Sequence, residues 1–181
     1  MAGISCWVFE TALGWVGIAD SAAGICRITL PQPTADLARA ALGKPGTNRL
    51  TNNLAATCQR LRDYYTGNPV IFPEPIDTSR ATPFQRGVWE LTHRIPYGHT
   101  RSYDWLARQL GRPGAARAVG QALNRNPLPI IVPCHRVITS DGRPGGFRGG
   151  TSLKQRLLDM EATVISRWPA SPPAAFPGSS A

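Results

Sequence analysis

The stretch Ile131-Val132-Pro133-Cys134-His135-Arg136-Val137-Ile138 sets a cysteine beside a histidine, between two short β-branched runs. Such runs are typical of buried strand or extended core. Pro133 biases Val132 away from helix and removes a backbone donor just before the cysteine. We therefore expect Cys134 on a constrained segment that emerges from the core. A thiol at such a position is either an unreactive part of the core packing or a positioned nucleophile.

The residue types alone leave the reaction open. A lone cysteine in an apolar run is most often a small buried hydrophobe, and neighbours on an extended segment point to opposite faces. His135 can nevertheless serve as the base that a thiol needs, directly or through one water. Glu161 can orient the imidazole and stabilise its cation. A thiol hydrolase would use the same set, so this class remains an alternative.

Further motifs surround this stretch. In order, they are Arg117-Ala118-Val119-Gly120-Gln121-Ala122, Asn126-Pro127 and Gly145-Gly146-Phe147-Arg148-Gly149-Gly150. Together with Pro-Cys-His-Arg-Val, they resemble the C-terminal domain of the O6-alkylguanine-DNA alkyltransferases, the methylated-DNA–protein-cysteine methyltransferases. The resemblance is dense from about Thr82 to Glu161 and weak before it.

The resemblance implies the reaction and its residues. The motif cysteine, here Cys134, takes the alkyl group from O6 of guanine, and from O4 of thymine, in one SN2-like step and is consumed. His135 deprotonates it through a water, and Glu161 holds the histidine. Tyr103 matches the tyrosine that assists the leaving guanine, and Asn126 matches the residue that braces the active-site turn.

The resemblance also implies how DNA is held. Arg117 matches an arginine that fills the stack after the damaged base is flipped out, on a helix that enters the minor groove. The implied DNA-binding residues are Ser102, Ala116, Arg117, Ala118, Gly120, Gln121 and Arg136. The implied pocket residues are Val137, Phe147, Arg148, Gly149 and Lys154. Some relatives have Tyr-Ser where this chain has Phe147-Arg148, and a long arginine there would narrow the pocket or contact a phosphate.

Cofactors and partners follow from the same resemblance. Some relatives bind zinc in the N-terminal domain through two cysteines and two histidines, but no histidine precedes His93, so Cys6 and Cys26 lack those partners. We expect no metal and no cofactor, a monomer, and duplex DNA carrying O6-alkylguanine as the partner. The alternative is a damage-binding module resembling the alkyltransferase-like proteins, which grip the lesion without reacting; these replace the motif cysteine, which is present here.

Charge distribution supports a nucleic-acid partner. Residues 1–79 carry six basic and six acidic side chains, whereas residues 80–161 carry thirteen basic side chains against five acidic ones, a net of +8. A surplus of positive charge could simply keep the protein soluble. Because this surplus consists mostly of arginine, it favours contacts with phosphates.

Composition excludes several other classes. No apolar run is long enough for a membrane span, and no signal pattern opens the chain. The four cysteines form no C-x-x-C pair, which argues against a disulfide framework and a zinc ribbon. We therefore expect a cytoplasmic protein associated with the nucleoid, or a nuclear one if the source is eukaryotic.

The first part of the chain predicts a small α+β scaffold without chemistry of its own, over residues 1–79. Strand-like runs cover residues 7–9, 15–18, 25–30 and 70–72. Helices are expected over residues 34–42, ended by Gly43, and from Thr47 or Asn48 to Tyr65. The buried stripe of the second helix comprises Leu50, Leu54, Cys58, Leu61 and Tyr65. Two prolines within residues 73–79 mark the linker.

The second part, residues 80–167, predicts a mainly helical domain. Thr82, Pro83 and Gln85 form a capping box for a helix that buries Phe84, Val88, Leu91 and Ile95. Helices over residues 102–110 and 115–124, joined by Gly111-Arg112-Pro113-Gly114, have the outline of a helix-turn-helix, a motif also found in proteins that never touch DNA. The small residues of the second helix suit close approach to a groove or tight helix packing. The helix-turn-helix is followed by a glycine-rich basic loop and a last helix over residues 152–162. A disordered tail is expected over residues 168–181.

Overall fold

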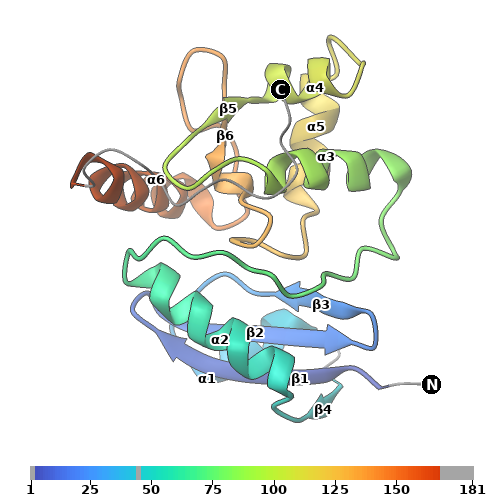
Figure 1. Ribbon diagram of the computed structural model, residues 1–181, viewed down its shortest axis with the longest axis vertical. Coiled ribbons are helices and arrows are strands. Elements are labelled where there is room, and N and C mark those ends of the chain that lie inside the picture. Colours follow the sequence, from blue (N-terminus) through green and yellow to red (C-terminus); the bar gives the residue numbers. More distant parts are fainter. Residues whose placement is uncertain (1–2, 44–45, 168–181) are drawn as a thin grey trace.

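The structure, a computed structural model, describes residues 3–43 and 46–167 (Figure 1). A sheet flanked by helices is followed by a mainly helical part, which confirms the predicted mixture of strands and helices. The first part contains β1 (Ser5–Thr11), β2 (Gly14–Ser21), β3 (Gly24–Ile28), α1 (Ala35–Leu42), β4 (Thr47–Asn48) and α2 (Asn52–Tyr65). The second contains α3 (Pro83–His93), β5 (Arg101–Ser102), α4 (Tyr103–Gln109), α5 (Ala116–Asn124), η1 (Cys134–Arg136), β6 (Val137–Ile138) and α6 (Gly150–Arg167).

The N-terminal sheet has the strand order β3-β2-β1-β4 and a helix on each face. Phe9 and Ile18 belong to the main apolar core, which also contains buried side chains of α2. On the other face, Leu42 of α1 packs with Cys6 and Ala19 in a smaller cluster. A Cβ at Gly17 would lie 2.7 Å from Cγ of Leu42, so only glycine lets α1 approach the sheet this closely.

Two expectations for this part are wrong. The second helix begins at Asn52 with Thr51 as its cap, because Thr47 and Asn48 pair with β1 as β4; Leu50 therefore lies outside the helix and is exposed. Residues 70–72 form no strand, because the free edge of β3 pairs with Ile76 instead. Cys58 is in the core as predicted.

The predicted linker, residues 73–79, runs along β3. The N–H of Ile25 donates to the carbonyl of Pro75, and the N–H of Asp77 donates to the carbonyl of Ile25, each at 2.8 Å. The Ser21 hydroxyl adds a 2.6 Å hydrogen bond to the Asp77 carboxylate. The main apolar core extends from Phe9 to Leu157 through both parts. The division into residues 1–79 and 80–167 stays a prediction.

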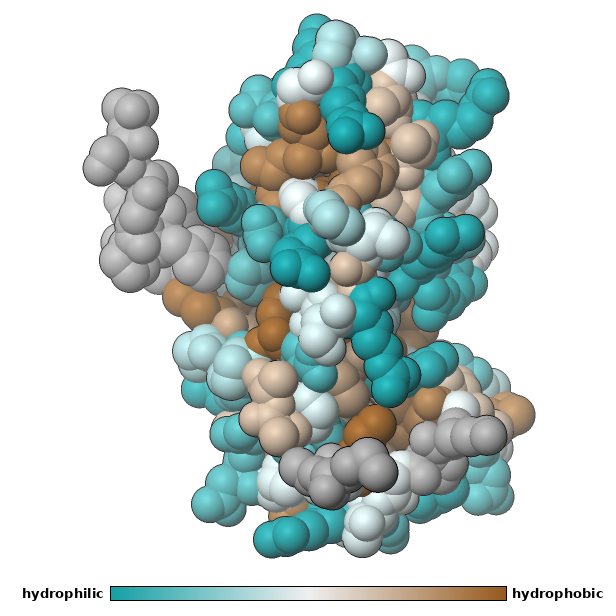
Figure 2. All heavy atoms as spheres, turned by 90° about the vertical axis from the view of Figure 1, so that its right-hand side faces the viewer, coloured by the Kyte–Doolittle hydropathy of each residue, from teal (hydrophilic) through white to brown (hydrophobic). Residues whose placement is uncertain are grey.

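Helices α3 and α4 begin where the caps predict. Thr82 and Gln85 form the capping box of α3, and the Ser102 hydroxyl accepts from the N–H of Trp105 at the start of α4. Helices α4 and α5 pack against each other as the two helices of a helix-turn-helix. Figure 2 shows that hydrophobic side chains gather on the upper part of the face to the right in Figure 1, bordered by hydrophilic ones.

Helix α6 is longer than predicted at both ends, covering Gly150–Arg167 instead of residues 152–162. Its last turns continue because Val164 lies against Gly67 and Ile165 lies against Gly98, so this end packs on two turns of the remaining chain. Within the described ranges, no helix is long and apolar enough to cross a membrane. The predicted tail, residues 168–181, lies outside them.

Candidate active site

Cys134 lies in a tight turn, on a constrained segment as predicted. Residues Cys134–Arg136 form the 3₁₀ helix η1, and the strand that follows is only two residues long. Asn126 braces this turn, because its Nδ2 donates to the carbonyl of Val132 at 2.8 Å and to Sγ of Cys134 at 3.3 Å. The same carbonyl accepts the N–H of Cys134 at 2.7 Å. Ile130, four residues before the cysteine, has φ of +76°, which is rare for a β-branched residue and indicates backbone strain in this segment.

The thiol is buried, with 8% of Cys134 exposed. Burial raises its pKa, while the hydrogen bond from Asn126 and the charge of Lys154 act in the opposite direction without cancelling it. The resting form is therefore the thiol, which needs a base before it can attack.

His135 and Glu161 form a buried pair beside the cysteine. Nε2 of His135 lies 2.8 Å from Oε1 of Glu161, and both side chains are almost fully buried. Burial would raise the pKa of Glu161, but the hydrogen bond from His135 and the charge of Arg136 hold it well below its usual range. Burial also lowers the pKa of His135, and the opposing effect of Glu161 does not offset this. The resting pair is thus a neutral imidazole beside a carboxylate.

The ionised carboxylate fixes the imidazole tautomer. Because it can only accept, Nε2 must carry the hydrogen, which leaves the lone pair on Nδ1. Nδ1 is buried and has no hydrogen-bond partner among the described residues. The structure therefore brings a buried, unengaged basic nitrogen next in sequence to the thiol, as the Cys-His-Glu set predicts.

Arg136 is not available to DNA, contrary to its predicted role. Its Nε and Nη2 donate to both oxygens of Glu161 at 2.9 to 3.2 Å, and Nη1 donates to the carbonyl of Ile95 at 2.7 Å. In a 3₁₀ turn its side chain follows His135 into the interior instead of pointing outward. This guanidinium belongs to the buried cluster.

Tyr64, from α2 in the N-terminal part, completes this cluster and was missed from the sequence. Its hydroxyl donates to Oε1 of Glu161 at 2.6 Å and lies 3.0 Å from Nε2 of His135. Burial, followed by the charge of Glu161, raises its pKa well above the ordinary value, so the phenol stays protonated. The only signal in the sequence is that a buried tyrosine needs a partner for its hydroxyl, and that signal does not name the partner.

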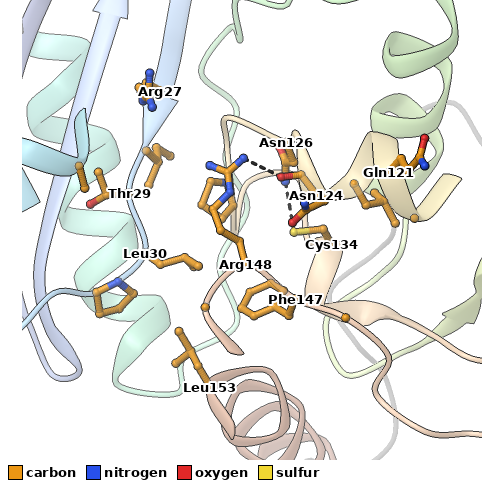
Figure 3. Close-up of a pocket in the computed structure, with 18 of the residues that line it drawn as sticks. Arg27, Thr29, Leu30, Gln121, Asn124, Asn126, Cys134, Phe147, Arg148 and Leu153 are labelled. Atoms are coloured by element: carbon orange, nitrogen blue, oxygen red, sulfur yellow. Dashed lines mark hydrogen bonds between the residues drawn. The ribbon is translucent and has the colours of Figure 1, made fainter. Parts of the chain in front are cut away.

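A cavity of about 830 Å³ opens in front of the thiol, between the two parts of the chain (Figure 3). The second part contributes Tyr103, Arg117, Asn126, Cys134, Phe147, Arg148 and Gly149, among others. The first part contributes a wall that the sequence did not predict, including Arg27, Thr29, Leu30 and Gln32. Nη2 of Arg148 donates to the carbonyl of Asn124 at 2.6 Å, and in Figure 3 this side chain stands between that wall and Cys134.

Two predicted pocket residues lie behind the cavity wall. Val137 is fully buried in β6, and Lys154 is fully buried on α6. Nζ of Lys154 donates to the carbonyl of Val137 at 2.5 Å and to the hydroxyl of Tyr103 at 3.3 Å. Lys154 therefore supports a cavity residue without lining the cavity.

Helix α5 places most of its predicted DNA-binding residues at the cavity rim. Ala116, Arg117, Gly120 and Gln121 line it, whereas Ala118 is exposed beside it. Ser102 caps α4 and does not line the cavity. In the described ranges, no group of three or more His, Cys, Asp or Glu side chains is arranged to hold a metal; that Cys6 and Cys26 are metal-free stays a prediction.

Comparisons with known proteins point to one family. The family described as "6-O-methylguanine DNA methyltransferase, DNA binding domain" matches residues 83–163. Among curated proteins, the methylated-DNA–protein-cysteine methyltransferase of Shigella flexneri is 44% identical over 123 residues, 67% of this chain and 72% of that protein. The constitutive enzyme of the same name from Bacillus subtilis is 42% identical over 154 residues, 84% of this chain and 92% of that protein.

Solved structures agree with these matches. Mycobacterium tuberculosis OGT in complex with DNA superposes with a TM-score of 0.76 at 33% identity, covering 88% of this chain and 93% of that one. The O6-methylguanine-DNA methyltransferase of the archaeon Pyrococcus kodakaraensis gives a TM-score of 0.58 at 26% identity, covering 87% and 98%.

Proposed function

The chain belongs to the methylated-DNA–protein-cysteine methyltransferase family, and from this premise we propose that it repairs duplex DNA by moving an alkyl group from O6 of guanine to Cys134. The observation that carries the proposal is the position of Cys134: it lines an open cavity, and the next residue in the chain, His135, is paired with Glu161 at 2.8 Å. A bond forms between Sγ and the alkyl carbon while the bond from that carbon to O6 breaks. The product thioether is stable, so each molecule acts once.

Thiolate formation is the task of His135. The thiol proton passes to Nδ1, directly or through one water, and the resulting imidazolium is stabilised by Glu161 at 2.8 Å. Asn126 donates to Sγ and stabilises the developing negative charge. His135 and Arg136 together hold the pKa of Glu161 well below its usual range, so this carboxyl stays ionised. The three catalytic groups thus have distinct roles as nucleophile, base and orienting carboxylate.

Tyr103 assists the leaving guanine. It lines the cavity with Cys134, and burial, together with the charge of Cys134, raises its pKa, so it keeps its proton at neutral pH. Its hydroxyl now donates to the carbonyl of Gly146 at a long 3.3 Å, a weak bond that a substrate can replace. A hydrogen bond from this phenol neutralises charge on the departing base.

DNA is bound through α5 in the minor groove. Small side chains on this helix let its backbone approach the narrow groove, and Arg117, exposed at the rim of the cavity, occupies the space left by the extruded base. The positive surplus of residues 80–161 attracts the phosphates.

Intact mass spectrometry tests this proposal. After mixing with a duplex oligonucleotide carrying one O6-methylguanine, the protein should gain one methyl group on Cys134 and then stop. Cys134→Ser should bind the same duplex and leave the lesion unrepaired. Repeated turnover contradicts the proposal, and tight binding of the lesion with an unchanged protein mass would instead support a non-reacting damage-binding protein.

A further inference from the structure

Tyr64 is the side chain that connects the N-terminal part to the His135–Glu161 pair. It comes from the end of α2, is 1% exposed, and its hydroxyl contacts both members of the pair at 2.6 and 3.0 Å. We propose that Tyr64 is a positioning residue for alkyl transfer, whose hydroxyl limits how strongly Glu161 holds the proton of His135. This inference rests on the proposed function and makes the N-terminal part a component of the active site.

The hydrogen-bond geometry assigns a direction to each proton. Oε2 of Glu161 accepts from Arg136 and from the N–H of Gly98 at 2.9 Å, so its lone pairs are engaged elsewhere. Oε1 accepts from Nη2 of Arg136 at 3.0 Å and is also shared by His135 and Tyr64, and both of these must donate because the carboxylate is ionised. The contact from Tyr64 is shorter, 2.6 Å against 2.8 Å for Nε2. Tyr64 therefore competes with His135 for the same oxygen.

This competition predicts the sign of a pH effect. A donor on Oε1 takes up part of the negative charge that would otherwise stabilise the imidazolium, which favours the neutral base that accepts the thiol proton. Removing the donor strengthens the attraction of Glu161 for imidazolium, so His135 should stay protonated to higher pH. The other groups that face the pair, all retained in the variant, are Arg136, Lys154, Tyr97 and the N–H of Gly98.

The neighbouring Tyr65 provides a matched control. It lies on the same helix, is 2% exposed, and its hydroxyl has no hydrogen-bond partner among the described residues. Tyr65→Phe and Tyr64→Phe each remove one buried hydroxyl from α2, and only Tyr64→Phe removes a donor from Glu161.

The test measures single-turnover methyl transfer from the O6-methylguanine duplex, at saturating protein, between about pH 5 and about pH 9. For Tyr64→Phe, the acid limb of the rate profile should move to higher pH by roughly half a unit or more, so the rate on the acid limb should fall by about threefold or more, and this loss should shrink as pH rises. Tyr65→Phe should keep the wild-type limb. Two results for Tyr64→Phe would overturn the inference. One is an unmoved acid limb with the same loss of rate at every pH, and the other is an acid limb that moves to lower pH.

A second variant keeps the test decisive if Tyr64→Phe does not fold. Fluorotyrosine incorporated at position 64 retains the ring and gives a more acidic phenol, hence a stronger donor, so the acid limb should move to lower pH. NMR titration of His135 in a Cys134→Ala background should follow the same two directions without any substrate. If the wild-type protein gains no methyl group, the proposed function fails. If it gains one, but neither variant moves the acid limb of the rate profile or the titration of His135, only the inference about Tyr64 fails.

Discussion

Arg117 and Arg136 carry the same charge, were both expected to contact DNA, and lie in opposite surroundings. Arg117 is exposed in the first turn of α5 at the cavity rim, whereas Arg136 is buried with its guanidinium bonded to both oxygens of Glu161. An exposed guanidinium remains available to a phosphate or a base stack, and a buried one is already neutralised by its partner. The region around Arg117 is therefore suited to bind, and the region around Arg136 to hold catalytic groups in place.

The largest effect that separates the two regions should be on stability. Arg136→Ala leaves the buried carboxylate of Glu161 without its charged partner, which should lower the free energy of unfolding by about 3–5 kcal/mol. Arg117→Ala removes the same charge from the surface and should change it by less than about 0.5 kcal/mol. Urea unfolding of both variants measures the difference, and similar losses would contradict the contrast.

Arg117→Ala should instead affect the repair of duplex DNA. Arg117→Ala removes the group that holds the lesion out of the stack, so duplex repair should slow by roughly one to three orders of magnitude. The reaction with free O6-benzylguanine should keep its rate, because Cys134, His135 and Glu161 are unchanged. Single-turnover rates on both substrates provide the measurement.

Arg117→Lys sharpens that prediction. The ammonium keeps the charge but cannot stack as guanidinium does, so only part of the duplex activity should return. Equal losses of Arg117→Ala on the duplex and on the free base, with a lower melting temperature, would assign Arg117 to the support of the fold.

The two regions also differ in how far the sequence predicts them. The helix that carries Arg117 follows from local signals: its small residues, the Gly111–Gly114 turn before it, and a charge surplus that starts at residue 80. The capping box of α3 and the first three strands of the sheet are local in the same sense, and the structure has them close to where they are predicted.

The buried cluster depends on tertiary structure. Tyr64 and Glu161 are 97 positions apart in the chain, and no local pattern indicates that they meet. The Arg136 side chain points inward because Cys134–Arg136 form a 3₁₀ turn. The β-branched residues on either side favour extended backbone, so the sequence does not indicate this turn. The start of α2 was placed too early because the helical spacing of Leu50 outweighed a two-residue strand that exists only by pairing with β1.

The buried region can also be tested through the effect of Lys154 on how stability changes with pH. Burial lowers its pKa to about 8, although the charge of Cys134 acts in the opposite direction. In the unfolded chain the pKa of lysine is about 10.4, so between these values the unfolded state binds a proton that the folded state lacks, and stability from this group rises with pH. The free energy of unfolding of the wild type minus that of Lys154→Met should therefore increase by more than about 1 kcal/mol from about pH 8 to about pH 10.

A neighbour on the same helix is the control for Lys154. Arg156 is exposed, so Arg156→Met removes a positive charge from the surface and leaves the buried ammonium in place, and it should show no such change with pH. A flat difference for Lys154→Met across the same interval would mean that the buried ammonium is charged throughout.

The smallest effect concerns Arg148, the exposed arginine that crosses the cavity. Its bond to the carbonyl of Asn124 closes space in front of Cys134, between the loop after β6 and the end of α5. We expect a methyl group to fit without disturbing this bond, and a benzyl group to require the side chain to move. Arg148→Ala should therefore raise the rate with O6-benzylguanine about 3- to 10-fold, equivalent to the loss of one hydrogen bond of about 1 kcal/mol. The rate with O6-methylguanine in duplex DNA should stay within about twofold, a difference near the limit of measurement.

Arg143→Ala is the matched control for Arg148→Ala, because Arg143 lies on the same loop, pairs with Asp141 and does not line the cavity. If Arg148 instead holds the substrate or a phosphate, Arg148→Ala should slow both substrates or the duplex alone. Competition between the two substrates in one reaction, with the adducts separated by mass, distinguishes a barrier from a contact.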